Sequence, residues 1–168
     1  INNAGTNQMN VGASSTMLEP WWEITPEGWS RVVAVNFSGP FFMARAAVPH
    51  LLKQKWGRLI GVTTSLDTMI RINMVPYGPS KAGHEAFVAT SAQELEGTGV
   101  TSNVLVPGGP VNTHLLPDNT TFDRAKLIQP DVMTTPVIWL ASEESDGING
   151  RRFIAYDWDE SLPMEERI

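Results

Sequence analysis

The sequence contains no cysteine and only three histidines among its 168 residues. The absence of cysteine excludes disulfide bonds, thiolate zinc sites and a cysteine nucleophile. His50, His84 and His114 lack the spacing of metal ligands, so we expect no metal site. We also expect His84, which lies in a predicted helix, to be at the surface or in an interface.

Positive charge is scarce as well. Twelve Lys and Arg stand against eighteen Asp and Glu, which gives a formal net charge of −6. No basic run is present that could neutralise a phosphate backbone, which argues against nucleic acid as a partner.

Long apolar runs are also missing. No uninterrupted run approaches the ~20 residues that a membrane span requires, and no signal-peptide pattern is present. We therefore expect no membrane partner and a cytoplasmic location. The chain starts at Ile1 without methionine, in what resembles the end of a buried strand, so we expect part of a longer protein.

The hydrophobic share of 42%, with 14 Gly and 12 Pro, is typical of a folded domain rather than of a disordered chain or a coiled coil. The length predicts a single domain over residues 1–168.

Apolar segments alternate between strand and helix patterns. Thr25-Pro26-Glu27 predicts a helix start, because Thr is a good N-cap and Pro suits the first helical position. Gly39-Pro40 predicts a kink in that helix, and Gly57 its end. We expect helices over 26–54, 77–96 and 130–141, strands over 1–5, 59–62, 100–106 and 153–155, and loops over 6–24, 66–75 and 111–130.

This alternation, with strands that are apolar throughout, predicts an α/β fold in which helices cover both faces of a parallel sheet. Functional loops of such sheets lie at the carboxyl ends of the strands. Here those ends carry Gly, Asn or hydroxyl side chains, at residues 2–5, 63–65 and 107–109. We expect the chemistry there.

Tyr77 and Lys81 are four residues apart at a predicted helix start and therefore share one face. A free phenol has a pKa near 10, and a cation held beside it lowers that value. Tyr77 could then exchange a proton with a carbonyl or alcohol oxygen, while Thr64 or Ser65 holds the same oxygen. The alternative is an ordinary pair on a helix surface.

Five motifs occur in a fixed order along the chain: Asn2-Asn3-Ala4-Gly5, Asn36 within a helix, Thr64-Ser65, Tyr77 with Lys81, and Pro107-Gly108. This order resembles the catalytic part of the short-chain dehydrogenase/reductase family, and the resemblance covers essentially the whole chain. It implies a Rossmann-like, doubly wound parallel sheet. It also implies an oxidoreductase that uses NAD or NADP for hydride transfer between a nicotinamide and a small-molecule carbonyl or secondary alcohol.

The resemblance further implies individual catalytic roles. Tyr77 would be the acid–base residue, and Lys81 would lower its pKa and bind the nicotinamide ribose. Asn36 would hold a water of the proton relay, although it could equally tie a loop to its helix. Ser65 would stabilise the substrate oxygen, but it is one residue closer to Tyr77 than the commonest family spacing. Thr64 matches that spacing, so either hydroxyl remains a candidate.

The implied cofactor contacts fall into two groups. On the adenosine side stand Asn3, Ala4 and Gly5. Around the nicotinamide stand Pro107, Gly108, Val111 and Thr113, together with Tyr77 and Lys81. The polar stretch from Asn112 to Asp123 would form a substrate lid.

The sequence departs from the family in one respect: no Gly-rich turn between a strand and a helix is present to hold a pyrophosphate. The sheet is therefore expected to be incomplete, without the family's N-terminal strands and helices. The alternative function is a catalytically silent fragment that serves as an oligomeric scaffold or binding module. The apolar outer faces of the two long helices predict a homodimer or homotetramer in either case.

Overall fold

The core of the fold is a parallel three-stranded sheet. The computed structural model describes residues 1–14, 19–116, 123–163 and 166–167. Its strands are β1 (Gly57–Val62), β2 (Val100–Val106) and β3 (Arg152–Ile154), in the order β1-β2-β3. Asn2 continues the sheet beyond β1 through a parallel bridge to Gly61. The predicted parallel arrangement is confirmed, but the predicted first strand is reduced to this bridge.

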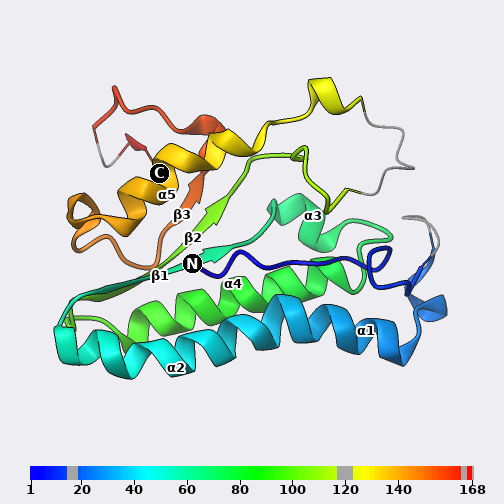
Figure 1. Ribbon diagram of the computed structural model, residues 1–168, viewed down its shortest axis with the longest axis horizontal. Coiled ribbons are helices and arrows are strands. Elements are labelled where there is room, and N and C mark those ends of the chain that lie inside the picture. The colour runs from blue at the N-terminus through cyan, green and yellow to red at the C-terminus, as the bar shows by residue number, and fades with distance from the viewer. Residues whose placement is uncertain (15–18, 117–122, 164–165, 168) are drawn as a thin grey trace.

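Helices cover both faces of the sheet, as the alternating pattern predicts. Figure 1 shows α4 and α2 below the sheet and α5 above it. The helices are α1 (Pro26–Val33), α2 (Gly39–Gln54), α3 (Leu66–Ile70), α4 (Tyr77–Glu94) and α5 (Thr134–Ala141). Short 3₁₀ turns lie at Trp21–Glu23, Arg124–Lys126, Pro130–Met133, Glu143–Ser145 and Ala155–Asp157.

The predicted start of the first helix is confirmed. The Thr25 hydroxyl accepts a hydrogen bond from the Gly28 amide at 3.1 Å, and Pro26 is the first helical residue. A π-helical turn over Ala34–Ser38 then joins α1 to α2. The irregularity expected at Gly39-Pro40 is therefore this turn, one step earlier in the chain.

Two local predictions are wrong. Gly57 does not end the helix: Lys55 ends it in the left-handed conformation at φ 56°, and Gly57 is the first residue of β1. A Cβ at Gly57 would lie 2.7 Å from the Leu51 side chain, so close packing explains this glycine. The segment after β1 is not a loop throughout, because it contains α3, which is capped by Ser65.

Three apolar clusters of described residues hold the layers together, the smallest of them formed by Val88, Val104 and Val106 between α4 and β2. One lies between the sheet and α5 and centres on Phe153 and Leu140, both fully buried. The Phe153 ring stands edge-on to Trp139, with centroids 5.7 Å apart. The third cluster, around Leu59 and Val100, lies on the α2 side of the sheet. Burial on both faces favours apolar residues along the strands, although β2 also buries the polar Thr101, Ser102 and Asn103.

Pro26–Gln54 is long and apolar enough to cross a membrane by length and composition, with a mean hydropathy of 1.2 over its 18-residue window. The prediction from uninterrupted apolar runs missed it, because polar residues break the runs without adding many charges. Core helices of soluble proteins meet the same criterion. Here the stretch carries the fully buried Asn36, which hydrogen-bonds to Ser80 of α4.

Candidate active site

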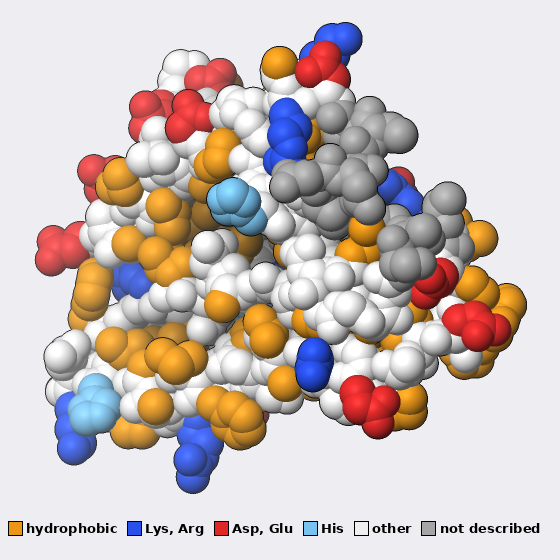
Figure 2. Space-filling model, turned by 45° about the vertical axis from the view of Figure 1, so that its right-hand side comes forward, with side chains coloured by type: hydrophobic (Ala, Val, Ile, Leu, Met, Phe, Trp, Pro, Cys, Tyr) orange, Lys and Arg blue, Asp and Glu red, His pale blue; other side chains and the backbone are white. Residues whose placement is uncertain are grey.

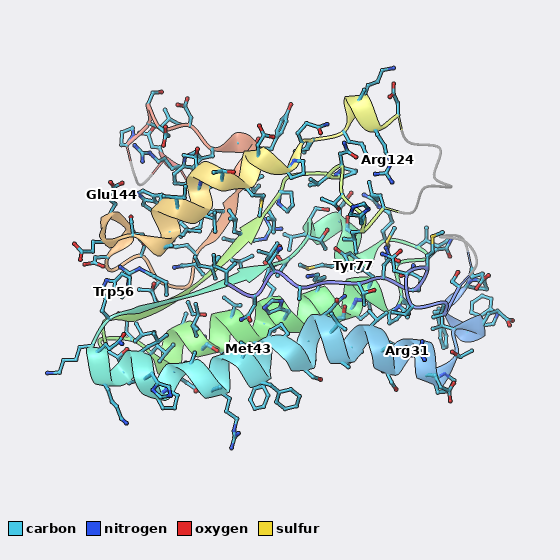
Figure 3. All side chains as sticks on the ribbon, in the orientation of Figure 1. Arg31, Met43, Trp56, Tyr77, Arg124 and Glu144 are labelled. Atoms are coloured by element: carbon cyan, nitrogen blue, oxygen red, sulfur yellow. The ribbon has the colours of Figure 1, made fainter. Side chains whose placement is uncertain are left out.

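The site lies where the carboxyl ends of the strands meet the start of α4. The Thr63 amide, just after β1, donates to the Leu105 carbonyl in β2 at 3.3 Å. A Cβ built at Gly5 would lie 3.5 Å from the Lys81 ammonium. Figure 3 labels Tyr77 at the first turn of α4, near the segment that follows β1. The parallel register thus brings together three of the predicted motifs.

Tyr77 is half-buried and hydrogen-bonds to the hydroxyl of Thr64. Burial raises the pKa of the Tyr77 phenol above its ordinary value, and the Thr64 hydrogen bond lowers it in part. Thr64 is therefore the hydroxyl that faces the phenol directly.

Lys81 is buried, and its ammonium donates to the Val62 carbonyl at 2.9 Å. Burial lowers the pKa of Lys81 to about 8, because a charged amine loses its hydration there. In the chain by itself, burial raises the pKa of Tyr77 by more than the Thr64 hydrogen bond lowers it. The Lys81 ammonium is hydrogen-bonded to the Val62 carbonyl at the end of β1. The expected lowering of the Tyr77 pKa by Lys81 therefore does not appear in this arrangement.

Asn36 lies in the π-helical turn and is fully buried. Its Nδ2 donates to the Thr6 carbonyl and to the Ser80 hydroxyl, both at 2.9 Å, and its Oδ1 accepts from the Thr6 amide at 2.9 Å. These bonds tie the loop after Gly5 to two helices. They match the structural role considered for Asn36, while its role in a proton relay stays a prediction.

Ser65 has a different partner from Thr64. Its Oγ accepts from the Thr68 amide at 3.2 Å and lies 2.8 Å from the Thr68 hydroxyl, so it caps α3. A side chain engaged as an N-cap is not free to hold a substrate oxygen without giving up the cap. Geometry therefore favours Thr64 of the two candidates that the sequence left open.

The residues expected around a nicotinamide follow β2. Gly108 has φ 103°, and a Cβ there would lie 2.6 Å from the Tyr156 Cβ, so only glycine suits this position. The Pro107 carbonyl accepts from the Tyr156 amide at 3.0 Å. Val111 forms a parallel bridge to Ile128, and the Thr113 hydroxyl accepts from the Leu115 amide at 3.3 Å.

On the opposite side of the site, Asn3, Ala4 and Gly5 are exposed to solvent. Their exposure leaves this strand end accessible to a ligand. Of the predicted lid, Asn112–Asp123, residues 117–122 lie outside the described part of the chain.

His84 is not at the surface, so that prediction is wrong. It is 1% exposed on α4 and packs against β1, where a Cβ at Gly61 would lie 2.9 Å from its Nε2. Neither ring nitrogen has a hydrogen-bond partner among the described residues. The signal available in the sequence was its position seven residues after Tyr77, which puts both on the sheet-facing side of the helix.

Burial, aided by the charge of Lys81, lowers the pKa of His84 from 6.5 to about 4. The unfolded chain therefore binds this proton more tightly than the folded one between these pH values, and stability must fall as the pH drops through that window. One pKa unit is worth ~1.4 kcal/mol, so we expect a loss of roughly 2–3 kcal/mol from pH 7 to 4.

This loss is measured by urea unfolding at pH 7 and 4. His84→Leu should lose less stability than the parent chain between these pH values by about that amount, and His50→Gln, a change at an exposed histidine of α2, should behave like the parent. Equal pH dependence in parent and His84→Leu would contradict the prediction.

Glu85 and Arg152 were not singled out from the sequence. Arg152 Nε donates to Glu85 Oε1 at 2.8 Å, and Arg152 Nη2 donates to the Thr64 carbonyl at 2.9 Å. The Thr63 hydroxyl donates to Glu85 Oε2 at 2.8 Å. Arg152 lies 67 residues beyond Glu85 in the chain, so no local sequence pattern predicts this ion pair.

Known proteins share this fold and sequence pattern. The model of the family described as short chain dehydrogenase matches residues 1–123, and the chain belongs to that family. A short-chain type dehydrogenase/reductase of Picea abies is 29% identical over 154 residues, which cover 84% of this chain and 56% of the relative. NADPH-dependent aldehyde reductase 2, a chloroplastic protein of Arabidopsis thaliana, is 31% identical over 79% of this chain and 52% of its own length.

Solved structures agree. A gluconate 5-dehydrogenase from Burkholderia cenocepacia, in complex with NADP and tartrate, superposes with a TM-score of 0.76 at 25% identity. The match covers 91% of this chain and 60% of that protein. The predicted Rossmann-like fold is confirmed, and the chain spans about half the length of the curated relatives it matches.

Proposed function

We propose that this chain is the catalytic part of an NAD(P)-dependent oxidoreductase that interconverts a small-molecule carbonyl and a secondary alcohol. The observation that carries the proposal is the hydrogen bond between the Tyr77 and Thr64 hydroxyls, formed at the strand ends next to the buried Lys81. A proton donor and a second hydroxyl are thus placed to share one substrate oxygen. The matches to proteins named as dehydrogenases and reductases support the enzyme over the silent scaffold.

Proton movement in this proposal is assigned to the chain's own side chains. The nicotinamide, when bound, supplies or accepts the hydride at the substrate carbon. In the reducing direction the Tyr77 phenol donates its proton to the carbonyl oxygen, and in the oxidising direction the phenolate takes it from the alcohol. The Thr64 hydroxyl donates a hydrogen bond to the same oxygen as negative charge develops there. Lys81 and Asn36 complete the group as the predicted phenolate-stabilising and relay residues.

The residues present fit the nicotinamide side of a dinucleotide. Gly108 and Thr113 are exposed after β2, on either side of Val111, and the exposed Asn3, Ala4 and Gly5 would meet the adenosine side. The complex of the Burkholderia protein with NADP supports a nicotinamide cofactor for this chain. The acidic or basic residue that would choose between NAD and NADP is not identified in this chain.

Cofactor binding tests the proposal directly. We expect NAD(H) or NADP(H) to quench the fluorescence of the six tryptophans, weakly, because no Gly-rich turn is present to hold the pyrophosphate. Carbonyl reduction, followed through the nicotinamide absorbance over a panel of aldehydes and ketones, should accompany binding in the enzyme that contains this chain. If neither NAD(H) nor NADP(H) binds or supports turnover, the result would favour the scaffold function.

A second copy of the chain is the proposed partner. Hydrophobic side chains, with charged ones between them, lie along the lower edge of the molecule, where α2 runs (Figure 2). The exposed apolar residues of this helix include Phe41, Phe42 and Met43, with Phe42 62% exposed. Association through α2 and α4 into a homodimer or homotetramer would cover them. The proposed location is the cytoplasm, as expected from the sequence. Pro26–Gln54 carries the buried Asn36 and packs as part of this domain, which supports a core helix over a membrane span.

A further inference from the structure

Glu85 and Arg152 form an ion pair that is attached to the strand end carrying Thr64. The side chain of Arg152 is 24% exposed and that of Glu85 19%, so water only partly screens the pair. Glu85 uses both carboxylate oxygens: one accepts from Arg152 and the other from the Thr63 hydroxyl. The Arg152 Nη2 donates a second hydrogen bond, to the Thr64 carbonyl. Hydrogen bonds between charged groups are short and directional, which makes the assembly stiff.

The two atoms held by this pair lie on either side of the Thr64 side chain. The Thr63 hydroxyl precedes the Thr64 Cα, and the Thr64 carbonyl follows it. Fixing both restrains the backbone of Thr64 and therefore the direction in which its Cβ points from the strand end. From this backbone position the Thr64 side chain reaches Tyr77, to which its hydroxyl is hydrogen-bonded.

Glu85 comes from the same helix as Tyr77. Eight residues separate them, which corresponds to about 12 Å along the helix axis. One rigid element therefore presents the phenol and also holds the strand end that carries the opposing hydroxyl. Arg152 completes the arrangement from β3, which lies next to β2 at the edge of the three-stranded sheet away from β1.

We propose that Glu85 and Arg152 are positioning residues that hold Thr63 and Thr64 so that the Thr64 hydroxyl stays against the Tyr77 hydroxyl. The inference rests on the proposed function, which gives these two hydroxyls their chemical task. A displacement of ~1 Å in a catalytic group can cost on the order of 100-fold in rate, so such a support has kinetic value.

The chain offers a spectroscopic test that needs no turnover. It has only two tyrosines, Tyr77 and the 65% exposed Tyr156. With ring-labelled tyrosine, NMR resolves both phenols, and the pKa of Tyr77 is read from a pH titration. The resonance of Tyr156 reports whether the fold is intact.

Glu85→Gln separates a positioning effect from a direct effect of charge, because the two effects predict opposite shifts of the Tyr77 pKa for this variant. Loss of the Thr64 hydrogen bond raises the pKa of Tyr77 further, because that bond lowers it in the parent chain. Positioning therefore predicts an upward shift for both Glu85→Gln and Arg152→Met. A purely coulombic effect predicts a fall for Glu85→Gln, which removes a negative charge, and a rise for Arg152→Met.

Two further variants complete the test. Thr63→Val changes no charge and little volume, and it should also raise the Tyr77 pKa; it serves if the charge variants do not fold. Asp146→Asn is the matched control, because the Arg58–Asp146 ion pair anchors the opposite end of β1. It should leave the Tyr77 titration unchanged.

Opposite shifts for the two charge variants, or a parent-like titration in folded Thr63→Val, would overturn the inference. In the active enzyme, Glu85→Gln should lower kcat by on the order of 100-fold with a much smaller effect on KM. A shifted titration without any NAD(P)-dependent turnover in the parent would refute the proposed function and leave the positioning intact. Turnover in the parent without the upward pKa shifts in the variants would support the proposed function and refute the positioning role.

Discussion

Replacing Tyr77 by phenylalanine should lower kcat by roughly 100- to 10,000-fold in the assembled enzyme, the range that a general acid–base group supplies. Phenylalanine keeps the ring that packs at the start of α4 but removes the only atom that exchanges a proton. Cofactor affinity should change little, because the hydroxyl is assigned to the substrate oxygen. The measurement is steady-state turnover together with a fluorescence titration of the cofactor.

The chain supplies its own control for that experiment. Tyr156→Phe removes the only other phenol, which lies after β3 and is exposed, and it should retain parent activity. Near-parent turnover of Tyr77→Phe would remove Tyr77 from its proposed role, and with it the acid–base scheme.

Thr64→Val and Ser65→Ala should have different consequences. Thr64→Val keeps the side-chain shape and removes the hydroxyl that faces Tyr77, so kcat should fall by roughly 100- to 1,000-fold, as for the loss of an oxyanion donor. Ser65→Ala removes the cap of α3 instead. It should lower stability by about 1 kcal/mol while kcat stays within a few-fold.

Both variants are compared by turnover and by urea unfolding. A large loss of kcat in Ser65→Ala, with Thr64→Val near parent activity, would reverse the assignment of the two hydroxyls. Small and equal losses would mean that neither hydroxyl stabilises the substrate oxygen.

Local patterns predicted the framework well. Thr25 with Pro26 marked the start of α1, and the buried strand predicted over Val100–Val106 coincides with β2. These signals are local because capping and strand burial act through neighbouring residues. Local patterns gave a wrong prediction at Gly57, which was expected to end the helix. This glycine is required because the Leu51 side chain packs against it, and not because the chain turns there.

The candidate site was predictable only in part. The order of the motifs placed Tyr77, Lys81 and Thr64 or Ser65 at one edge of the sheet. It could not decide between the two hydroxyls, because adjacent residues differ only in which way each side chain turns. His84 was misplaced for a related reason: which flank of α4 is buried depends on β1, and in particular on the space left by Gly61.

Amino-acid order alone thus established the family, the parallel sheet and the edge at which chemistry would occur, since periodicity, caps and motif order are properties of short segments. Folding in three dimensions settled what depends on partners distant in the chain. It turned Thr64 toward the phenol, engaged Ser65 in a cap, buried His84 and joined Glu85 to Arg152. Hydrogen bonds and burial are made between surfaces that meet only after the strands and helices have packed, so the patterns of neighbouring residues do not decide them.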